Sequence, residues 1–255
     1  MSYLVDTHCH LDNQCYENDF EEVILRAKSK GIEKIIIPGA DPKDLPRAID
    51  IAQNHPYIYF APGIHPYEIG SSTLDSISCW ATHPKCVGIG ECGLDYYRLP
   101  QTNQDIYKAL QKEVFISQIQ LALKHDLPLI VHIREASKDA FEILNTYKNL
   151  RGVLHCFNAD EILLGLSDRF YYGIGGVCTF KNAKKIIEIL PKIPKNRLLL
   201  ETDAPYLTPH PHRGERNEPM FIPLIVQKLS ETLMMSPDEI AHLSTQNAYQ
   251  LFGKI

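Results

Sequence analysis

The chain has 255 residues, of which 44% are hydrophobic and 22% are charged, so it can bury a large core and is neither disordered nor fibrous. Its 26 basic and 31 acidic residues give a net charge of −5, which argues against a protein that grips long duplex nucleic acid over a broad basic surface. Binding of a strand end is still compatible with this balance.

Short apolar runs bounded by Gly, Pro or polar residues predict eight strands, at 3–5, 34–37, 58–61, 87–90, 129–131, 153–154, 170–174 and 198–200. Helical periodicity predicts helices at 20–30, 44–54, 106–125, 136–147, 182–190, 222–233 and 237–252, and is weak at 71–80. Eight units of about 32 residues are the length that a strand, a helix and two loops require. The sequence therefore predicts an α/β fold, a (β/α)8 TIM barrel, with residues 1–255 forming one domain.

Two of these helices carry more specific predictions. In 106–125, apolar residues recur three and four apart and predict one buried face, made of Ile106, Leu110, Val114, Phe115, Ile119 and Ala122. The last helix is preceded by Ser236, Pro237 and Glu239 in the order of an N-cap, a first-turn proline and a capping-box glutamate.

Polar residues follow the predicted strands where each strand ends. In a parallel barrel the carboxyl ends of the strands form one rim, and the catalytic residues lie there. We expect this rim to collect the polar residues at the ends of strands one, four, five, six and eight, namely His8, His10, Glu91, His132, His155 and Asp203.

Several imidazoles and carboxylates in one desolvated site cost several kcal/mol unless a cation or hydrogen-bond partners compensate. In an extended chain His8 and His10 point the same way and can reach one ion. Imidazole with carboxylate suits Zn²⁺, Mn²⁺ or Fe²⁺, and a bridging carboxylate also admits Mg²⁺. Strand parity turns Cys9, Cys92 and Cys156 away from the site, so thiolate ligation is the weaker alternative.

Several longer motifs carry a family resemblance. They are DTHCHL (6–11), GIHPY (63–67), GECGLDYYR (90–98), VHIREA (131–136), HCF (155–157) and ETDAPYLTPHPHRGERNEP (201–219). Together they resemble the TatD family of metal-dependent deoxyribonucleases, over the chain from residue 6 to the NAYQLF segment at 247–252.

The resemblance implies an amidohydrolase-like hydrolase with two divalent metal ions (Mg, Mn or Zn). His8 and His10 match the ligands of the first metal, Glu91 the shared carboxylate, and His132 and His155 the ligands of the second. Asp203 matches the carboxylate that contacts metal and water. The expected activity is deoxyribonuclease cleavage of DNA phosphodiester bonds from a single-stranded or frayed end by a metal-bound hydroxide, with Asp203 and Glu91 as the catalytic residues.

The chemistry of the individual residues leaves several roles open. Asp203 either accepts the proton of the attacking water or is only a ligand. Glu201 is either an anchor behind a ligand histidine or half of a buried structural pair. The candidate phosphate contacts are His65, Arg134, His212, Arg213 and Arg216, with surface solvation or local salt bridges as the alternative. A further metal site at His210 and His212 is a weaker possibility.

Two other function classes fit the same residues. The first is a metal-dependent hydrolase of a small-molecule or aminoacyl ester, lactone or phosphoester, and the second is a non-catalytic metal-dependent binding module. Seven cysteines without a CxxC pair, no signal-like start and no long apolar run predict a reduced, cytoplasmic protein. We expect no membrane association and infer no obligate protein partner.

Overall fold

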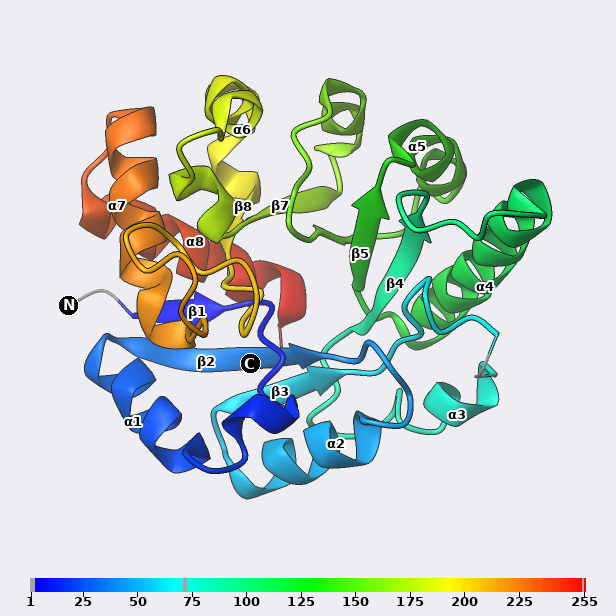
Figure 1. Cartoon of the computed structure of the whole chain (residues 1–255), viewed down its shortest axis with the longest axis horizontal. Helices are drawn as coiled ribbons and strands as arrows, with labels where there is room; N and C mark the ends of the chain where they lie inside the picture. Colours follow the sequence, from blue (N-terminus) through cyan, green and yellow to red (C-terminus); the bar gives the residue numbers. More distant parts are fainter. Residues whose placement is uncertain (1–2, 71–72, 254) are drawn as a thin grey trace.

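Eight parallel strands alternate with helices in the computed structural model of the chain, which describes residues 3–70, 73–253 and 255 (Figure 1). The strands are β1 (Leu4–Asp6), β2 (Ile32–Pro38), β3 (Ile58–Ala61), β4 (Ile89–Asp95), β5 (Leu129–Arg134), β6 (Gly152–Leu154), β7 (Phe170–Ile174) and β8 (Leu198–Leu200). Each overlaps a predicted strand. The largest difference is β4, which continues five residues beyond its predicted end at residue 90.

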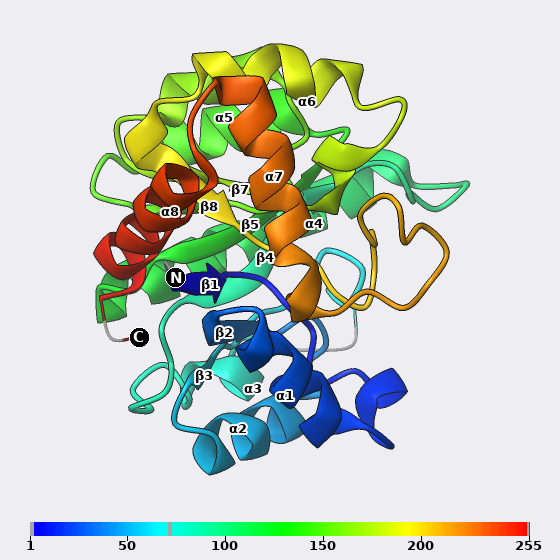
Figure 2. The ribbon, with the colours of Figure 1, turned by 90° about the vertical axis from the view of Figure 1, so that its left-hand side faces the viewer.

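The strands close into a barrel. Continuous ladders join β1 to β3 and β4 to β8, and the two seams between these sheets are spanned by the single bridges Phe60 to Cys86 and Cys9 to Ala204. At the second seam the His10 amide donates to the Ala204 carbonyl over 2.8 Å. The predicted (β/α)8 barrel is therefore confirmed, with its helices forming an outer ring around the strands (Figures 1 and 2).

The helices largely follow the predicted ranges. They are α1 (Phe20–Ser29), α2 (Leu45–Asn54), α3 (Asp75–Ser78), α4 (Gln104–His125), α5 (Ser137–Thr146), α6 (Lys184–Ile189), α7 (Ile222–Leu233) and α8 (Pro237–Phe252). Short 3-10 helices occupy Gln14–Tyr16, Glu161–Leu166, Gly176–Thr179, Leu190–Lys192, Lys195–Arg197 and Pro219–Phe221. The weak pattern at 71–80 contains α3, while residues 71 and 72 lie outside the described residues. Helix α8 begins with the predicted capping box of Ser236 and Glu239.

The predicted buried face of α4 is wrong in its first half. Phe115, Ile119 and Ala122 are buried, but Ile106 is 69% exposed and Leu110 is 36% exposed. The buried face also includes two glutamines, Gln111 and Gln118, whose side chains are fully buried.

The two buried glutamines are needed for backbone hydrogen bonds. The Gln111 side chain accepts from the Asp95 amide and donates to the Asp95 carbonyl, both over 2.9 Å. Gln118 makes the same pair of bonds to Ile64, over 2.8 and 3.0 Å. Buried backbone groups at strand ends require partners, and an amide side chain supplies one donor and one acceptor together. Helix α4 therefore positions the ends of β3 and β4, which lead into the site.

The apolar residues form two layers. One cluster fills the barrel interior with strand residues such as Val5, Ile36 and Leu199, and includes Leu251 and Phe252 from the end of α8. The larger cluster lies between strands and helices and contains Cys9 and Cys92, as strand parity predicts. No helix within the described residues has both the length and the apolar character needed to cross a membrane.

Candidate metal centre

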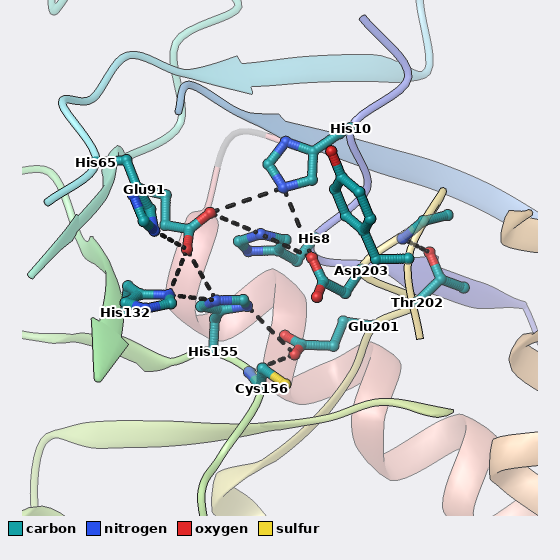
Figure 3. Close-up of polar contacts among 12 residues, drawn as sticks. His8, His10, His65, Glu91, His132, His155, Cys156, Glu201, Thr202 and Asp203 are labelled. Carbon is teal, nitrogen blue, oxygen red and sulfur yellow. Dashed lines mark hydrogen bonds and ion pairs between the residues drawn. The ribbon is translucent and has the colours of Figure 1, made fainter. Parts of the chain in front are cut away.

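The polar residues predicted at the strand ends lie together at one rim of the barrel (Figure 3). Two of them, Glu91 and His132, belong to strands β4 and β5, and the others lie within four residues of the ends of β1, β6 and β8. The assembled set is His8, His10, Glu91, His132, His155 and Asp203.

Glu91 is the centre of this set and is only 4% exposed. Its Oε1 lies 2.8 Å from His132 Nδ1 and 3.0 Å from His155 Nε2. Its Oε2 lies 3.2 Å from His8 Nε2 and 3.7 Å from His10 Nε2. One carboxylate thus presents one oxygen to each of two histidine pairs, which is the arrangement a bridging ligand needs.

Asp203 lies on the side of the first histidine pair. Its Oδ1 is 3.7 Å from His8 Nε2 and 3.6 Å from His10 Nε2. The backbone at Asp203 has a left-handed φ of 55°, and its amide donates to the His8 carbonyl over 2.8 Å. A left-handed conformation is costly for a residue other than glycine and occurs mostly at sites where surrounding contacts hold it.

The site has the features of a cation site. His8 is fully buried, stacks on His155 with ring centres 3.8 Å apart, and neither of its ring nitrogens makes a hydrogen bond. Buried polar atoms without partners are costly, and an ion on the imidazole nitrogen would remove that cost. Three groups of ligand atoms lie within 4.8 Å of one another: His8 with His10 and Glu91, His65 with Glu91 and His132, and His8 with His155 and Glu201. All the donor atoms are nitrogen or oxygen, so the donor set fits divalent cations of the zinc, manganese or magnesium type.

Both acidic residues of the site are ionised. Burial by itself would raise the pKa of Glu91, but the charge of His155 and the close contacts of its carboxylate with the rings of His132, His155 and His8 hold that pKa well below its usual value. For Asp203 the opposing effect of burial is outweighed by a hydrogen bond from His10 and the nearby histidine charges, so its pKa is also lowered. Two carboxylates in this form supply the negative charge that a divalent ion requires.

His65, from the loop after β3, lies beside Glu91 and His132 in one of the three groups of ligand atoms. Its Nδ1 accepts a hydrogen bond from the Tyr67 amide over 3.1 Å, so in the neutral ring the proton is on Nε2. That nitrogen is 3.6 Å from Glu91 Oε1. Burial lowers the pKa of His65 to about 3, so the ring is neutral. His65 therefore presents an N–H donor to the centre of the site.

Glu201 lies behind the second histidine pair. It is fully buried, and its Oε1 is 3.6 Å from His155 Nδ1 and accepts the amide of Cys156. A side chain at Gly173 would meet it, since a Cβ there would lie 2.6 Å from the Glu201 carboxyl carbon. Glu201 is thus packed where an anchor for His155 would be.

Asp95 is a supporting carboxylate that the sequence analysis missed. Its Oδ2 accepts from His132 Nε2 over 3.0 Å and from the Tyr67 hydroxyl over 2.5 Å. The proton of His132 is thereby placed on Nε2, and Nδ1 is free to face Glu91. The sequence spacing could have indicated it, because Asp95 is four residues after Glu91 in an extended strand and its side chain therefore lies on the same face.

A cavity of about 910 Å³ lies over these residues. Three cations line it without an ion pair among the described residues: Arg98, Arg134 and Lys185. The predicted Arg134 packs its guanidinium 3.7 Å above the Tyr97 ring. Arg98 and Lys185 were not singled out from the sequence.

Arg216 and His212, predicted to contact phosphate, do not line this cavity. Arg216 donates to both oxygens of Asp19, over 2.8 and 2.6 Å, and to Glu218 over 2.9 Å. His212 lies 3.1 Å from Glu215 and stacks on a phenylalanine. Nearby carboxylates already pair with both side chains, which favours the salt-bridge alternative, and a phosphate contact by either residue stays a prediction.

Arg213 also falls outside the set of cavity-lining residues. Its guanidinium donates to the Thr208 carbonyl over 2.8 Å and lies 3.9 Å above the Phe180 ring. Its predicted role as a phosphate contact is not supported by this placement. Neither His210 nor His212 belongs to a group of metal-ligand atoms among the described residues.

One of the three cysteines, Cys156, does not follow strand parity. Strand β6 ends at Leu154, and Cys156 has a left-handed φ of 42° in the loop beyond it. Period-two alternation does not apply there, and Cys156 lines the cavity. Burial raises the pKa of its thiol well above the usual value, which opposes a thiolate at this position.

Comparison with known proteins gives a consistent result. A family model described as TatD related DNase matches residues 5–253. A Bacillus subtilis (strain 168) protein described as the uncharacterized metal-dependent hydrolase YabD is 41% identical, with 98% of each chain covered. A Citrobacter rodentium (strain ICC168) protein named 3'-5' ssDNA/RNA exonuclease TatD is 32% identical, again with 98% of both chains covered. The crystal structure of YJJV, a TatD homolog from Escherichia coli K12, superposes with a TM-score of 0.89 at 30% identity and 98% coverage of each chain.

Proposed function

The chain belongs to the TatD family of metal-dependent hydrolases, and from this premise we propose that it uses two divalent ions to hydrolyse DNA phosphodiester bonds from a single-stranded or frayed end. The main support for the proposal is the position of Glu91, because its two carboxylate oxygens face separate histidine pairs. The proposal treats residues 1–255 as one hydrolase domain acting in the cytoplasm, in keeping with seven cysteines that form no disulfide.

Two groups of residues would hold the ions. His8, His10 and Asp203 with Glu91 Oε2 form the first, and His132 and His155 with Glu91 Oε1 form the second. Bound ions of this kind polarise phosphodiester oxygens and lower the pKa of water, which makes a nucleophile near neutral pH.

The residues of the chain supply proton transfer and orientation. Asp203 is ionised and has its carboxylate at the rim, where it can accept the proton of an attacking water. Asp95 binds His132 Nε2 over 3.0 Å and Glu201 lies 3.6 Å from His155 Nδ1, so each carboxylate favours the ring orientation that directs the other nitrogen toward Glu91. His65 would donate its Nε2 proton to a substrate oxygen.

The charges of the cavity fit an anionic substrate with few phosphates. Arg98, Arg134 and Lys185 are free to receive phosphate oxygens, whereas a duplex binder makes about 6 to 10 such contacts. A net charge of −5 opposes wider binding of the duplex. The name of the Citrobacter rodentium relative, a single-stranded DNA and RNA exonuclease, supports the same substrate class.

The test is to remove metal with a chelator, restore Mg²⁺, Mn²⁺ or Zn²⁺ separately, and compare end-labelled single-stranded DNA with a phosphomonoester and a lactone. We expect shortening of the labelled DNA only after metal is restored. If the loaded protein leaves the DNA intact and hydrolyses the lactone or another ester, the alternative of a small-molecule or aminoacyl ester hydrolase is correct.

A further inference from the structure

One wall of the cavity has no part in the metal centre and is mostly apolar. It is formed by the loops after β6, β7 and β8, which are neighbours in the sheet, so the wall is continuous. Its apolar side chains are Phe157, Val177, Phe180, Ala183, Ile186 and Leu207. A phosphodiester has no group that would use such a wall, so it must serve another part of the substrate.

A cation holds the aromatic ring of Phe180, in this wall, in a defined orientation. The Arg213 guanidinium lies 3.9 Å from the ring centre, and the same guanidinium is tied to the Thr208 carbonyl over 2.8 Å. Arg213 covers one face of the ring, and the other face has no aromatic or cationic neighbour among the described residues. Phe180 is half-buried and lines the cavity, so part of the ring is accessible to an incoming planar group.

Two polar side chains on the same segment complete this surface. Asn182 and Lys185 line the cavity, and neither side chain has a hydrogen bond or an ion pair among the described residues. An amide can pair with the edge of a nucleobase, and an ammonium can pair with the adjoining phosphate. An apolar ring, a free amide and a free cation within six residues match the parts of one nucleotide.

We propose that Phe180 is a stacking platform for an unpaired nucleobase next to the scissile phosphodiester, with Arg213 fixing the ring from behind. This inference rests on the proposed nuclease function and adds a specificity residue to it. Every base has a π-face, so the platform accepts any base and requires that it be unpaired. Single strands and frayed ends would therefore be selected by stacking.

The experiment combines a substitution of Phe180 with removal of the base from the substrate end. Phe180→Ala and the wild type are compared on a single-stranded oligonucleotide and on the same oligonucleotide with an abasic residue at the end that the wild type attacks. Deoxyribose and ribose versions of each oligonucleotide show whether the platform serves DNA, RNA or both. For the wild type we expect kcat/KM to fall about 5- to 150-fold on the abasic end, the range that base stacking on aromatic side chains gives. For Phe180→Ala we expect kcat/KM to fall by the same factor on the intact oligonucleotide. On the abasic oligonucleotide, kcat/KM of this variant should equal that of the wild type.

Two variants control for folding and for the ring itself. Phe180→Tyr keeps the ring and should cleave the intact end within about threefold of the wild type. Phe141→Ala removes a half-buried ring from α5, outside the cavity, and should leave the ratio of intact to abasic cleavage unchanged. Equal losses for Phe180→Ala on both substrates, or no loss on either, would overturn the stacking platform while leaving the nuclease function intact. A wild type that cleaves no oligonucleotide would instead remove the proposed function, and this inference with it.

Discussion

Asp95→Asn is the sharpest test of how the chain prepares His132 for metal. The Asp95 carboxylate is fully buried and accepts four donors. Its Oδ2 takes the His132 Nε2 proton over 3.0 Å and the Tyr67 hydroxyl over 2.5 Å, and its Oδ1 takes the amides of Tyr97 and Arg98 over 2.9 and 3.4 Å.

An asparagine of the same shape has only one accepting oxygen. The two backbone amides cannot turn away, so they keep that oxygen, and the new NH₂ group faces His132 Nε2. His132 must then accept at Nε2 and carry its proton on Nδ1, the nitrogen 2.8 Å from Glu91 Oε1. A protonated Nδ1 cannot bind a cation. We expect metal affinity to fall about 10- to 100-fold, the usual cost of losing such a supporting carboxylate.

Metal affinity is measured by competition with a chelator of known strength, and stability by thermal melting. Tyr67→Phe is the matched control because it removes one donor to the same carboxylate and keeps the His132 contact. We expect Tyr67→Phe to lower the free energy of unfolding by about 1 kcal/mol, which lowers Tm by roughly 2–4 °C, and to leave metal affinity unchanged. Wild-type metal affinity in Asp95→Asn, with only a lower Tm, would refute the tautomer argument and reduce Asp95 to a structural role.

Three further predictions concern other parts of the molecule. Asp203→Asn should lower kcat by about 10²- to 10⁴-fold with metal content largely retained, as measured by single-turnover kinetics and metal analysis; an equal loss of metal would make Asp203 a ligand alone. Gly173→Ala should clash with the Glu201 carboxylate and destabilise the fold by about 1–3 kcal/mol in denaturant titrations, whereas Gly175→Ala meets neighbours only at 3.5 Å or more and should be tolerated. Hydrogen bonds from a neighbouring arginine hold the pKa of Asp19 at about 2, below its usual 3.8. The contribution of ionised Asp19 to the free energy of unfolding is therefore complete above about pH 4 and is lost as the pH falls toward 2. After discounting for solvent screening, this contribution is about 1 kcal/mol. We expect Asp19→Asn to remove that part of the acid dependence of stability.

The fold and the gathering of the rim residues followed from local patterns. Apolar runs, helical spacing and proline positions depend on residues close in the chain, so β7, β8, α7 and α8 have their predicted bounds. The polar residues after strand ends were also predictable, because parallel strands in a barrel bring their carboxyl ends to one rim. His8, His10 and Glu91 meet for this reason.

The errors arose where a partner comes from a distant segment. Gln111 and Gln118 are buried in α4 because backbone groups at Asp95 and Ile64 need them, and spacing within one helix does not reveal that need. The same limit applies to Arg216, because its ion pair with Asp19, 197 residues away in sequence, cannot be read from the local motif.

Periodicity and motifs of a few residues were enough to predict the barrel, the family and which side chains reach the rim. How those side chains are used became clear from the tertiary structure. It showed that Glu91 divides its oxygens between two histidine pairs, that Asp95 sets the proton of His132, and that Arg134 is free where Arg216 is not. Such properties depend on distances and protonation between separate strands and loops, which become defined only when the chain is folded.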